Sequence, residues 1–181
     1  MSEAPQGNKP FAGGSPEAKA ILAWWHGLHG DETRDGDKGE LAELRRASTL
    51  TEVVLSRAYQ RLRHALLEAG VFRGDCEYQA AAVARVLARV KSAAPGLGFA
   101  RIMAEDKGGK PRISEARFKR LLREQDRGQL ASDLIRLLPM LENRADPVRL
   151  AGDIWLWGES VRRAWANDYY LEVFRKKETT S

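Results

Sequence analysis

The most unusual stretch of this sequence is residues 108–128, GGKPRISEARFKRLLREQDRG, which carries seven basic side chains against three acidic ones. A guanidinium group matches the geometry of phosphate oxygens, so a row of arginines suits contact with a nucleic acid. On a helix, Phe118, Leu121 and Leu122 would share one arc. The opposite half would carry Arg117, Lys119, Arg120 and Arg123. The pattern predicts a helix anchored on one side that presents arginines on the other.

An alternative interpretation is that these arginines form solvated ion pairs. Glu115 and Glu124 lie close enough in sequence to pair with some of them on an exposed helix. The distribution of charge favours a ligand, because the net charge is +5 and residues 101–127 hold nine basic and five acidic side chains. The rest of the chain is almost balanced. Excess charge in one short segment is typical of a surface for a polyanion.

Other candidate sites have less support. His26 and His29 are three residues apart beside an acidic loop, but no third ligand completes a zinc site. The run GGKP lacks the spacing of a phosphate-binding loop. The five tryptophans mostly fall at core spacing, with base stacking a minor possibility at Trp157. We expect no metal and no cofactor.

Catalysis is also not indicated. The adjacent Glu105 and Asp106 would point in different directions on a helix, and no partner carboxylate is placed to make a metal-dependent nuclease. Cys76, the only cysteine, has no motif of a nucleophile. A lone cysteine and the lack of a long apolar run lead us to expect a cytoplasmic protein without a membrane segment.

The elements that would position the arginines are helices. The chain has 181 residues, 43% of them apolar, and is rich in alanine, leucine, arginine and glutamate. We predict an all-α fold, a bundle of about eight helices. The predicted parts are a disordered lead at 1–14, an N-terminal helical half at 15–95, a C-terminal helical half at 96–172 and a tail at 173–181. Residues 96–98 form a candidate hinge.

Several local signals mark where helices begin and end. Helix starts are expected at Ser15 with Pro16, at the capping-box pair Thr49 and Glu52, at Ser114 with its staple Ile113 and Phe118, and at Asp146 with Pro147. Further helices are expected at 39–47, from Thr49 to Gly70, at 75–93, over 97–104 and after Gly158. Pro139 should bend or end the helix that follows Gly128.

Several collinear motifs resemble one known family. LGFARIMA at 97–104, RISEARFKRLL at 112–122, LIRLLPML at 134–141 and DIWLWGESVRRAWANDYY at 153–170 resemble the CasB family, the small subunit of the type I-E CRISPR surveillance complex Cascade. The tracts WW at 24–25 and ELRRA at 43–47 also fit. The lead, the loop EDKGGK and the acidic loop at 31–37 are departures from the family pattern.

The resemblance implies a non-catalytic, all-helical subunit that assembles with other Cascade subunits, the guide RNA and a second copy of itself. It implies contact with single-stranded DNA of the R-loop, where guide pairing reads the sequence and protein holds the strands. It carries over Arg45, Arg46, Arg101, Arg117, Arg127 and Arg136 as nucleic-acid-binding residues. Arg120 joins them from the charge pattern.

Two rival hypotheses stay open at this point. A stand-alone helical DNA-binding regulator could use the helix after Ser114 to read duplex DNA, and would prefer one duplex sequence. A nuclease with scattered carboxylates would need metal-dependent turnover. The absence of clustered Asp, Glu and His counts against the nuclease, whereas the regulator differs from a Cascade subunit in that the subunit would bind weakly and without regard to sequence.

Overall fold

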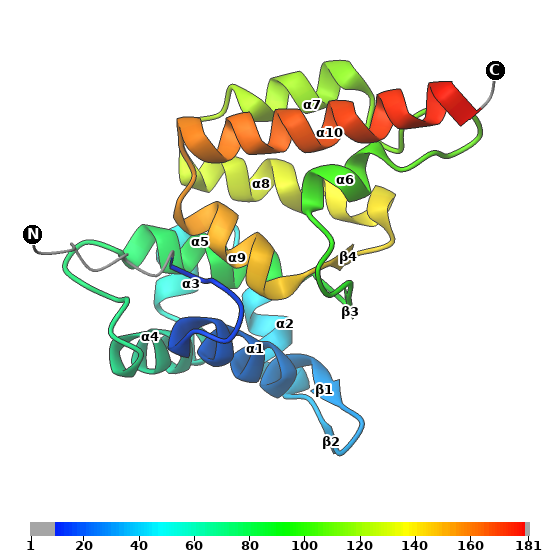
Figure 1. The fold of residues 1–181 in the computed structure, drawn as a ribbon. Helices are drawn as coiled ribbons and strands as arrows, with labels where there is room; N and C mark the ends of the chain where they lie inside the picture. The colour runs from blue at the N-terminus through cyan, green and yellow to red at the C-terminus, as the bar shows by residue number, and fades with distance from the viewer. Residues whose placement is uncertain (1–9, 180–181) are drawn as a thin grey trace, which may run out of the picture.

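The computed structural model describes residues 10–179, without the side chains of 176, 177 and 179. Ten α-helices make up most of this described part (Figure 1). They are α1 Pro16–His29, α2 Lys38–Arg46, α3 Leu50–Val54, α4 Arg57–Glu68, α5 Glu77–Leu87, α6 Phe99–Ala104, α7 Glu115–Leu122, α8 Arg127–Leu137, α9 Pro147–Trp155 and α10 Glu159–Thr179. The prediction of an all-α bundle is confirmed.

A 3₁₀ helix and four two-residue strands connect these helices. The 3₁₀ helix η1, Leu138–Leu141, follows α8 directly. Strands β1 Gly30–Asp31 and β2 Arg34–Asp35 form an antiparallel hairpin. Strands β3 Ser92–Ala93 and β4 Arg144–Ala145 pair in parallel, with Ser92 opposite Arg144. This second pair ties the segment after α5 to the segment before α9.

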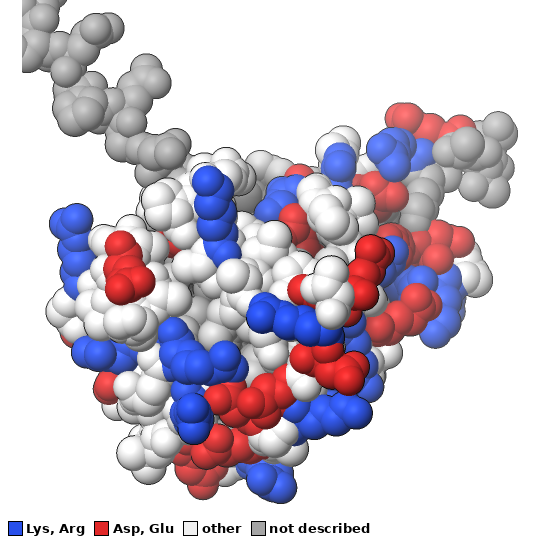
Figure 2. Space-filling view, turned by 90° about the horizontal axis from the view of Figure 1, so that it is seen from below, with Lys and Arg blue, Asp and Glu red and all other residues white. Residues whose placement is uncertain are grey.

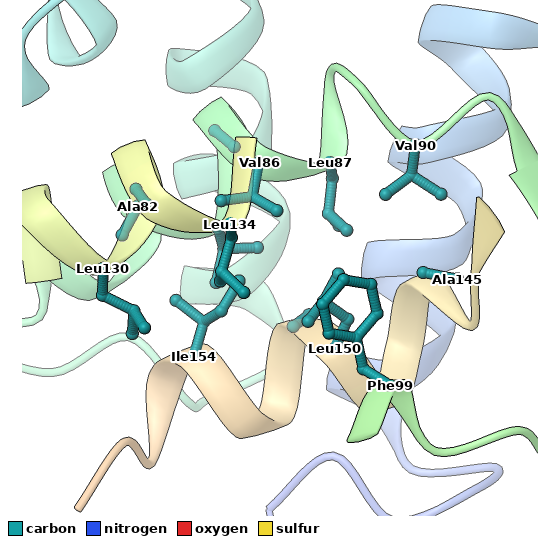
Figure 3. Packing of buried hydrophobic residues seen from close by; sticks show 14 of the residues in the cluster. Ala82, Val86, Leu87, Val90, Phe99, Leu130, Leu134, Ala145, Leu150 and Ile154 are labelled. Atoms are coloured by element: carbon teal, nitrogen blue, oxygen red, sulfur yellow. The ribbon is translucent and has the colours of Figure 1, made fainter. Parts of the chain in front are cut away.

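The helices lie in tiers around α5 and α9. Figure 1 shows α7, α10 and α8 at the top, α1 and α4 at the bottom, and α5 and α9 between them. The apolar faces of α5, α8 and α9 meet in the centre, where Val86, Leu134 and Ile154 are completely buried (Figure 3). Because α9 also packs against α1, the central helices join segments from both predicted halves. The division into two halves stays a prediction.

Most of the expected helix starts are present. The Ser15 hydroxyl accepts a hydrogen bond from the Ala18 amide at 3.2 Å, and the Asp146 carboxylate caps α9. The capping box of Thr49 and Glu52 is complete. Ser114 stands at the N-cap of α7, but its side chain makes no capping hydrogen bond. The backbone at Ser114 thus takes the expected extended conformation without the expected side-chain contact.

Two predicted helices differ from the structure. The helix expected from Thr49 to Gly70 is broken into α3 and α4, because Ser56 starts a new helix by accepting from the Tyr59 amide at 3.2 Å. The helix expected at 75–93 is α5, and it ends at Leu87 because the chain then turns into β3. Pro139 converts the end of α8 into η1, as expected of a residue that lacks an amide hydrogen.

Both ends of the described chain depart from the predicted lead and tail. Residues 1–9 of the lead lie outside the described part. Phe11, within the lead, is buried, because its ring packs against Trp155 with 5.5 Å between centroids. The helix α10 continues to Thr179 through the predicted tail, since no glycine or proline interrupts it. No helix in the described part is long and apolar enough to cross a membrane.

Candidate nucleic-acid interface

Aromatic contacts fix the arginine-bearing helix α7 on the body of the protein. The rings of Phe118 and Tyr169 stack with centroids 4.0 Å apart and planes at 9°. The Tyr169 hydroxyl, buried, donates to the Ile113 carbonyl at 2.7 Å. Helix α7 therefore lies against α10 with its orientation set (Figure 1). This anchoring holds the opposite face of α7, with its arginines, towards solvent.

A groove runs between α7 and the end of α8. Its volume is about 330 Å³. It is lined by Arg117, Arg120, Leu121, Asp133, Arg136, Leu137 and Met140. The three arginines are exposed, whereas Leu121 and Leu137 keep only 2% and 9% of their surfaces exposed. The groove thus combines a charged rim with an apolar floor.

The three arginines on the rim of the groove differ in whether a carboxylate pairs with them. Arg136 pairs with Asp133 at 3.1 Å across one helical turn, with 67% of the arginine side chain exposed. Arg117 Nη1 contacts the Met140 sulfur at 3.3 Å, which is a weak acceptor. Among residues 10–179 with described side chains, neither Arg117 nor Arg120 has a carboxylate in ion-pair contact. Both guanidinium groups keep their charge available to a ligand.

The carboxylates that could have paired with these arginines are engaged elsewhere. Glu115 pairs with Lys119 at 2.6 Å and accepts from the Tyr170 hydroxyl at 2.9 Å. Glu124 accepts hydrogen bonds from two backbone amides just after α7, both at 2.9 Å. Asp126 caps α8 through the Gln129 amide. The ion-pair interpretation therefore does not describe Arg117 or Arg120.

A second group of arginines lies along α5 and is named here the α5 seam: Arg45, Arg85 and Arg89. Arg45 Nε donates to the Ala88 carbonyl at 3.0 Å, and Arg89 Nη2 donates to the Arg45 carbonyl at 2.5 Å. Arg89 Nη1 also donates to the Arg85 carbonyl, 3.2 Å away. Neutral carbonyls accept these bonds, so they orient the guanidinium groups without cancelling their charge.

Burial shapes the electrostatics of the α5 seam. Desolvation lowers the pKa of Arg85 and of Arg89, and repulsion from Arg85 and Arg45 lowers that of Arg89 further. The Glu52 carboxylate acts in the opposite direction on the pKa of Arg85. Arginine still stays protonated at neutral pH. The seam is consequently a concentration of positive charge that is only partly solvated.

Helix α8 connects the seam to the groove. Arg85 Nη1 donates to the Ser132 hydroxyl at 2.9 Å, and Ser132 lies one helical turn before Arg136. Repulsion from Arg136 contributes to the lowered pKa of Arg85. The positive charge therefore extends from α2 across α5 and α8 to the groove beside α7.

The structure distributes the seven predicted site residues over three settings. Arg117, Arg120 and Arg136 meet at the groove. Arg45 belongs to the seam and Arg46, exposed, follows it at the end of α2. The remaining two lie away from the groove. Arg127 Nη2 donates to the Trp155 and Trp157 carbonyls at 3.1 and 3.4 Å. Arg101, on α6, is partly buried and does not line the groove.

Sequence reasoning missed Arg85 and Arg89. Both lie within the predicted helix at 75–93, whose apolar face was the basis of that prediction. Their spacing of four residues would place them on one side of the predicted helix, and that spacing was the available signal, although α5 ends at Leu87, before Arg89. What the spacing does not reveal is that Arg85 contacts α8 and Arg89 contacts α2.

The lower face of the molecule carries charges of both signs. Figure 2, seen from below, shows Lys and Arg interspersed with Asp and Glu. Between helices α2 and α4, buried Glu40 forms ion pairs with Arg57, at 3.5 Å, and with Arg61. Arg57 and Arg61 therefore share a carboxylate partner, whereas Arg117 and Arg120 have none among the described side chains.

The weaker candidate sites have structural roles. All five tryptophans are buried, and the Trp157 indole donates to the Glu124 carbonyl at 2.8 Å, so Trp157 offers no face for base stacking. His29 Nε2 lies 3.0 Å from the Leu87 carbonyl. The described residues contain no group of three or more His, Cys, Asp or Glu side chains placed to hold a metal ion.

Comparison with known proteins identifies the family. A family model for CRISPR-associated protein Cse2 matches residues 40–170. A chain in the crystal structure of E. coli Cascade bound to a PAM-containing dsDNA target aligns with a TM-score of 0.66 at 24% identity, over 86% of this chain and 97% of that one. CasB from Thermus thermophilus aligns with a TM-score of 0.60 at 27% identity, over 86% and 98%. Curated protein sequences give no match.

Proposed function

Because this chain belongs to the CRISPR-associated Cse2 family, as its resemblance to CasB predicted, we propose that it is a non-catalytic subunit of a Cascade complex. In that complex it assembles with the other subunits, the guide RNA and a second copy of itself. Its task is to stabilise the R-loop by holding unpaired DNA through phosphates. Guide pairing supplies the sequence specificity in such effectors.

The observation that carries this proposal is the set of arginines at the groove between α7 and α8. Arg117 and Arg120 lack carboxylate partners among the described residues, and Arg136 faces them from α8 with most of its side chain exposed. Exposed arginines whose charge is not cancelled bind phosphates strongly and without regard to sequence. The α5 seam adds a positive field that extends the same surface.

The positions of the other arginines support a path for the strand across the protein. A backbone that contacts the groove can continue over Ser132 towards Arg85 and Arg89, and from there to Arg45 and Arg46 on α2. The exposed members of this path would contact phosphates directly. Arg85, which is buried, and the partly buried Arg45 and Arg89 would act mainly through their field, since they already donate to a hydroxyl or to carbonyls.

The experiment that tests the function is R-loop lifetime in the assembled complex. Arg117→Glu/Arg136→Glu should shorten the lifetime of the R-loop on a matched target and leave the preference for the guide sequence unchanged. The control is Arg34→Glu/Arg163→Glu, which changes the net charge equally at two exposed arginines outside the groove. An R-loop lifetime equal to that of the unchanged complex in the groove variant would refute the proposed function.

A further inference from the structure

The floor of the groove between α7 and α8 is not explained by phosphate binding. Phosphates need donors and positive charge, both of which the rim supplies. The floor is instead formed by Leu121, Leu137 and the Met140 thioether. The volume of about 330 Å³ is at the lower end of pockets that enclose small organic ligands. A planar apolar group has room there.

We propose that this groove takes up one unstacked nucleobase of a single strand while Arg117, Arg120 and Arg136 hold the phosphates on either side of it. The inference rests on the proposed function and adds a ligand class, an unpaired base, to the same site. A base in a duplex is stacked and paired, so only a single strand can place a base there.

The contacts of Arg117 favour a base over other occupants. Its guanidinium lies against the Met140 sulfur at 3.3 Å, so this exposed side chain contacts the apolar floor with one edge. Guanidinium planes stack on nucleobases, and any base offers such a face. A base between this guanidinium and the leucines would be covered on both faces without selection for its sequence.

Asp133 argues against an anion inside the groove. This carboxylate belongs to the groove lining and already accepts from Arg136 at 3.1 Å and from Gln129 Nε2 at 3.0 Å. A phosphate pushed to the same depth would meet a like charge, whereas a neutral base would not. Phosphates are thereby kept at the rim and the base at the floor.

The rival occupant is an acidic segment of a partner protein, with one apolar side chain in the groove. Such a segment would also satisfy the rim arginines and the leucine floor. The two occupants can be told apart with a strand that keeps its phosphates but lacks bases. If the groove takes up a base, this strand should bind less tightly than an intact strand.

The test is fluorescence anisotropy of the full-length purified chain with two labelled single strands of equal length. One strand carries bases throughout, and the other carries abasic sites at consecutive central positions. The intact strand should bind about tenfold more tightly, which is the usual size of one base stacking contact. A base releases no counterions, so plots of log Kd against log salt for the two strands should be parallel.

Two variants separate the base from the phosphates. Met140→Ala should reduce the difference in affinity between the two strands and leave the slope of log Kd against log salt unchanged. Arg117→Gln/Arg136→Gln should weaken the binding of both strands. It should also lower the slope of log Kd against log salt by about 0.7 for each phosphate that the variant no longer neutralises. Equal affinity of the two strands for the unchanged chain would overturn the base site, leave the phosphate surface intact and favour the acidic protein segment. Absence of binding to either strand at low salt would overturn the base site together with its premise.

Discussion

Replacing Arg127 with glutamine is expected to destabilise the fold rather than weaken nucleic-acid binding. Arg127 begins α8, and its Nη2 donates to the carbonyls of Trp155 and Trp157 at the end of α9. A cation at a helix C-terminus also interacts favourably with the helix dipole. Glutamine is too short to reproduce these bonds, so the carbonyls lose their donor.

The magnitude follows from those two hydrogen bonds. Hydrogen bonds to a charged group contribute about 1.5–3 kcal/mol, and the longer of the two, at 3.4 Å, adds little. We expect a loss of about 2 kcal/mol in the free energy of unfolding. For a chain of this length that corresponds to a decrease in Tm of about 4–8 °C.

The assay is thermal and urea unfolding by circular dichroism, together with single-strand anisotropy under native conditions. The matched variant is Arg120→Gln, an equal substitution at an exposed arginine on the groove. Arg120→Gln should keep the Tm and lose affinity, whereas Arg127→Gln should do the reverse. If Arg127→Gln kept its Tm and lost single-strand binding, the intramolecular role assigned to Arg127 would be refuted.

Two further predictions concern pH and the anchoring of α7. Burial, followed by repulsion from Arg45, His26 and Lys91, lowers the pKa of His29 from 6.5, so the unfolded chain takes up this proton more readily. The free energy of unfolding should therefore fall as the pH drops below about 6.5. His29→Gln should reduce this dependence on pH. An equal slope of unfolding free energy against pH in both proteins would contradict the prediction. Tyr169→Phe should cost about 1–3 kcal/mol in urea unfolding, because the Ile113 carbonyl loses its donor, and an unchanged midpoint would disprove this.

Local signals in the sequence were sufficient to predict most of the helix starts, but not every helix boundary. Pro147 after Asp146, and the pair Thr49 and Glu52, act within one helical turn, so no knowledge of the fold is needed to read them. The break at Ser56 was missed, although a serine before a helical run can start a helix. There the apolar periodicity continues across the break and conceals it.

The site could be predicted only in part, because its arginines come from separate helices. The outward face of α7, with Arg117 and Arg120, follows from helical periodicity. The family resemblance supplied Arg136 as a site residue, but its position opposite Arg117 and Arg120 depends on how α7 packs beside α8 and was not predicted. The acceptors of Arg127 are carbonyls 28 and 30 residues further along the chain, and no local sequence pattern predicts such a contact.

The placement of the carboxylates decides which arginines are open to a ligand. Buried Glu40 forms ion pairs with Arg57 and Arg61 and so joins α2 to α4. Beside α7, the acids bind lysine, tyrosine or backbone amides, and the neighbouring arginines keep their charge. Both amides donate to the same oxygen of Glu124, Oε1, and so hold its carboxylate at the turn after α7. The capping of α8 and the exposure of positive charge on α7 are therefore coupled, so a substitution that frees Glu124 or Asp126 from its amides would also screen the arginines that face the groove.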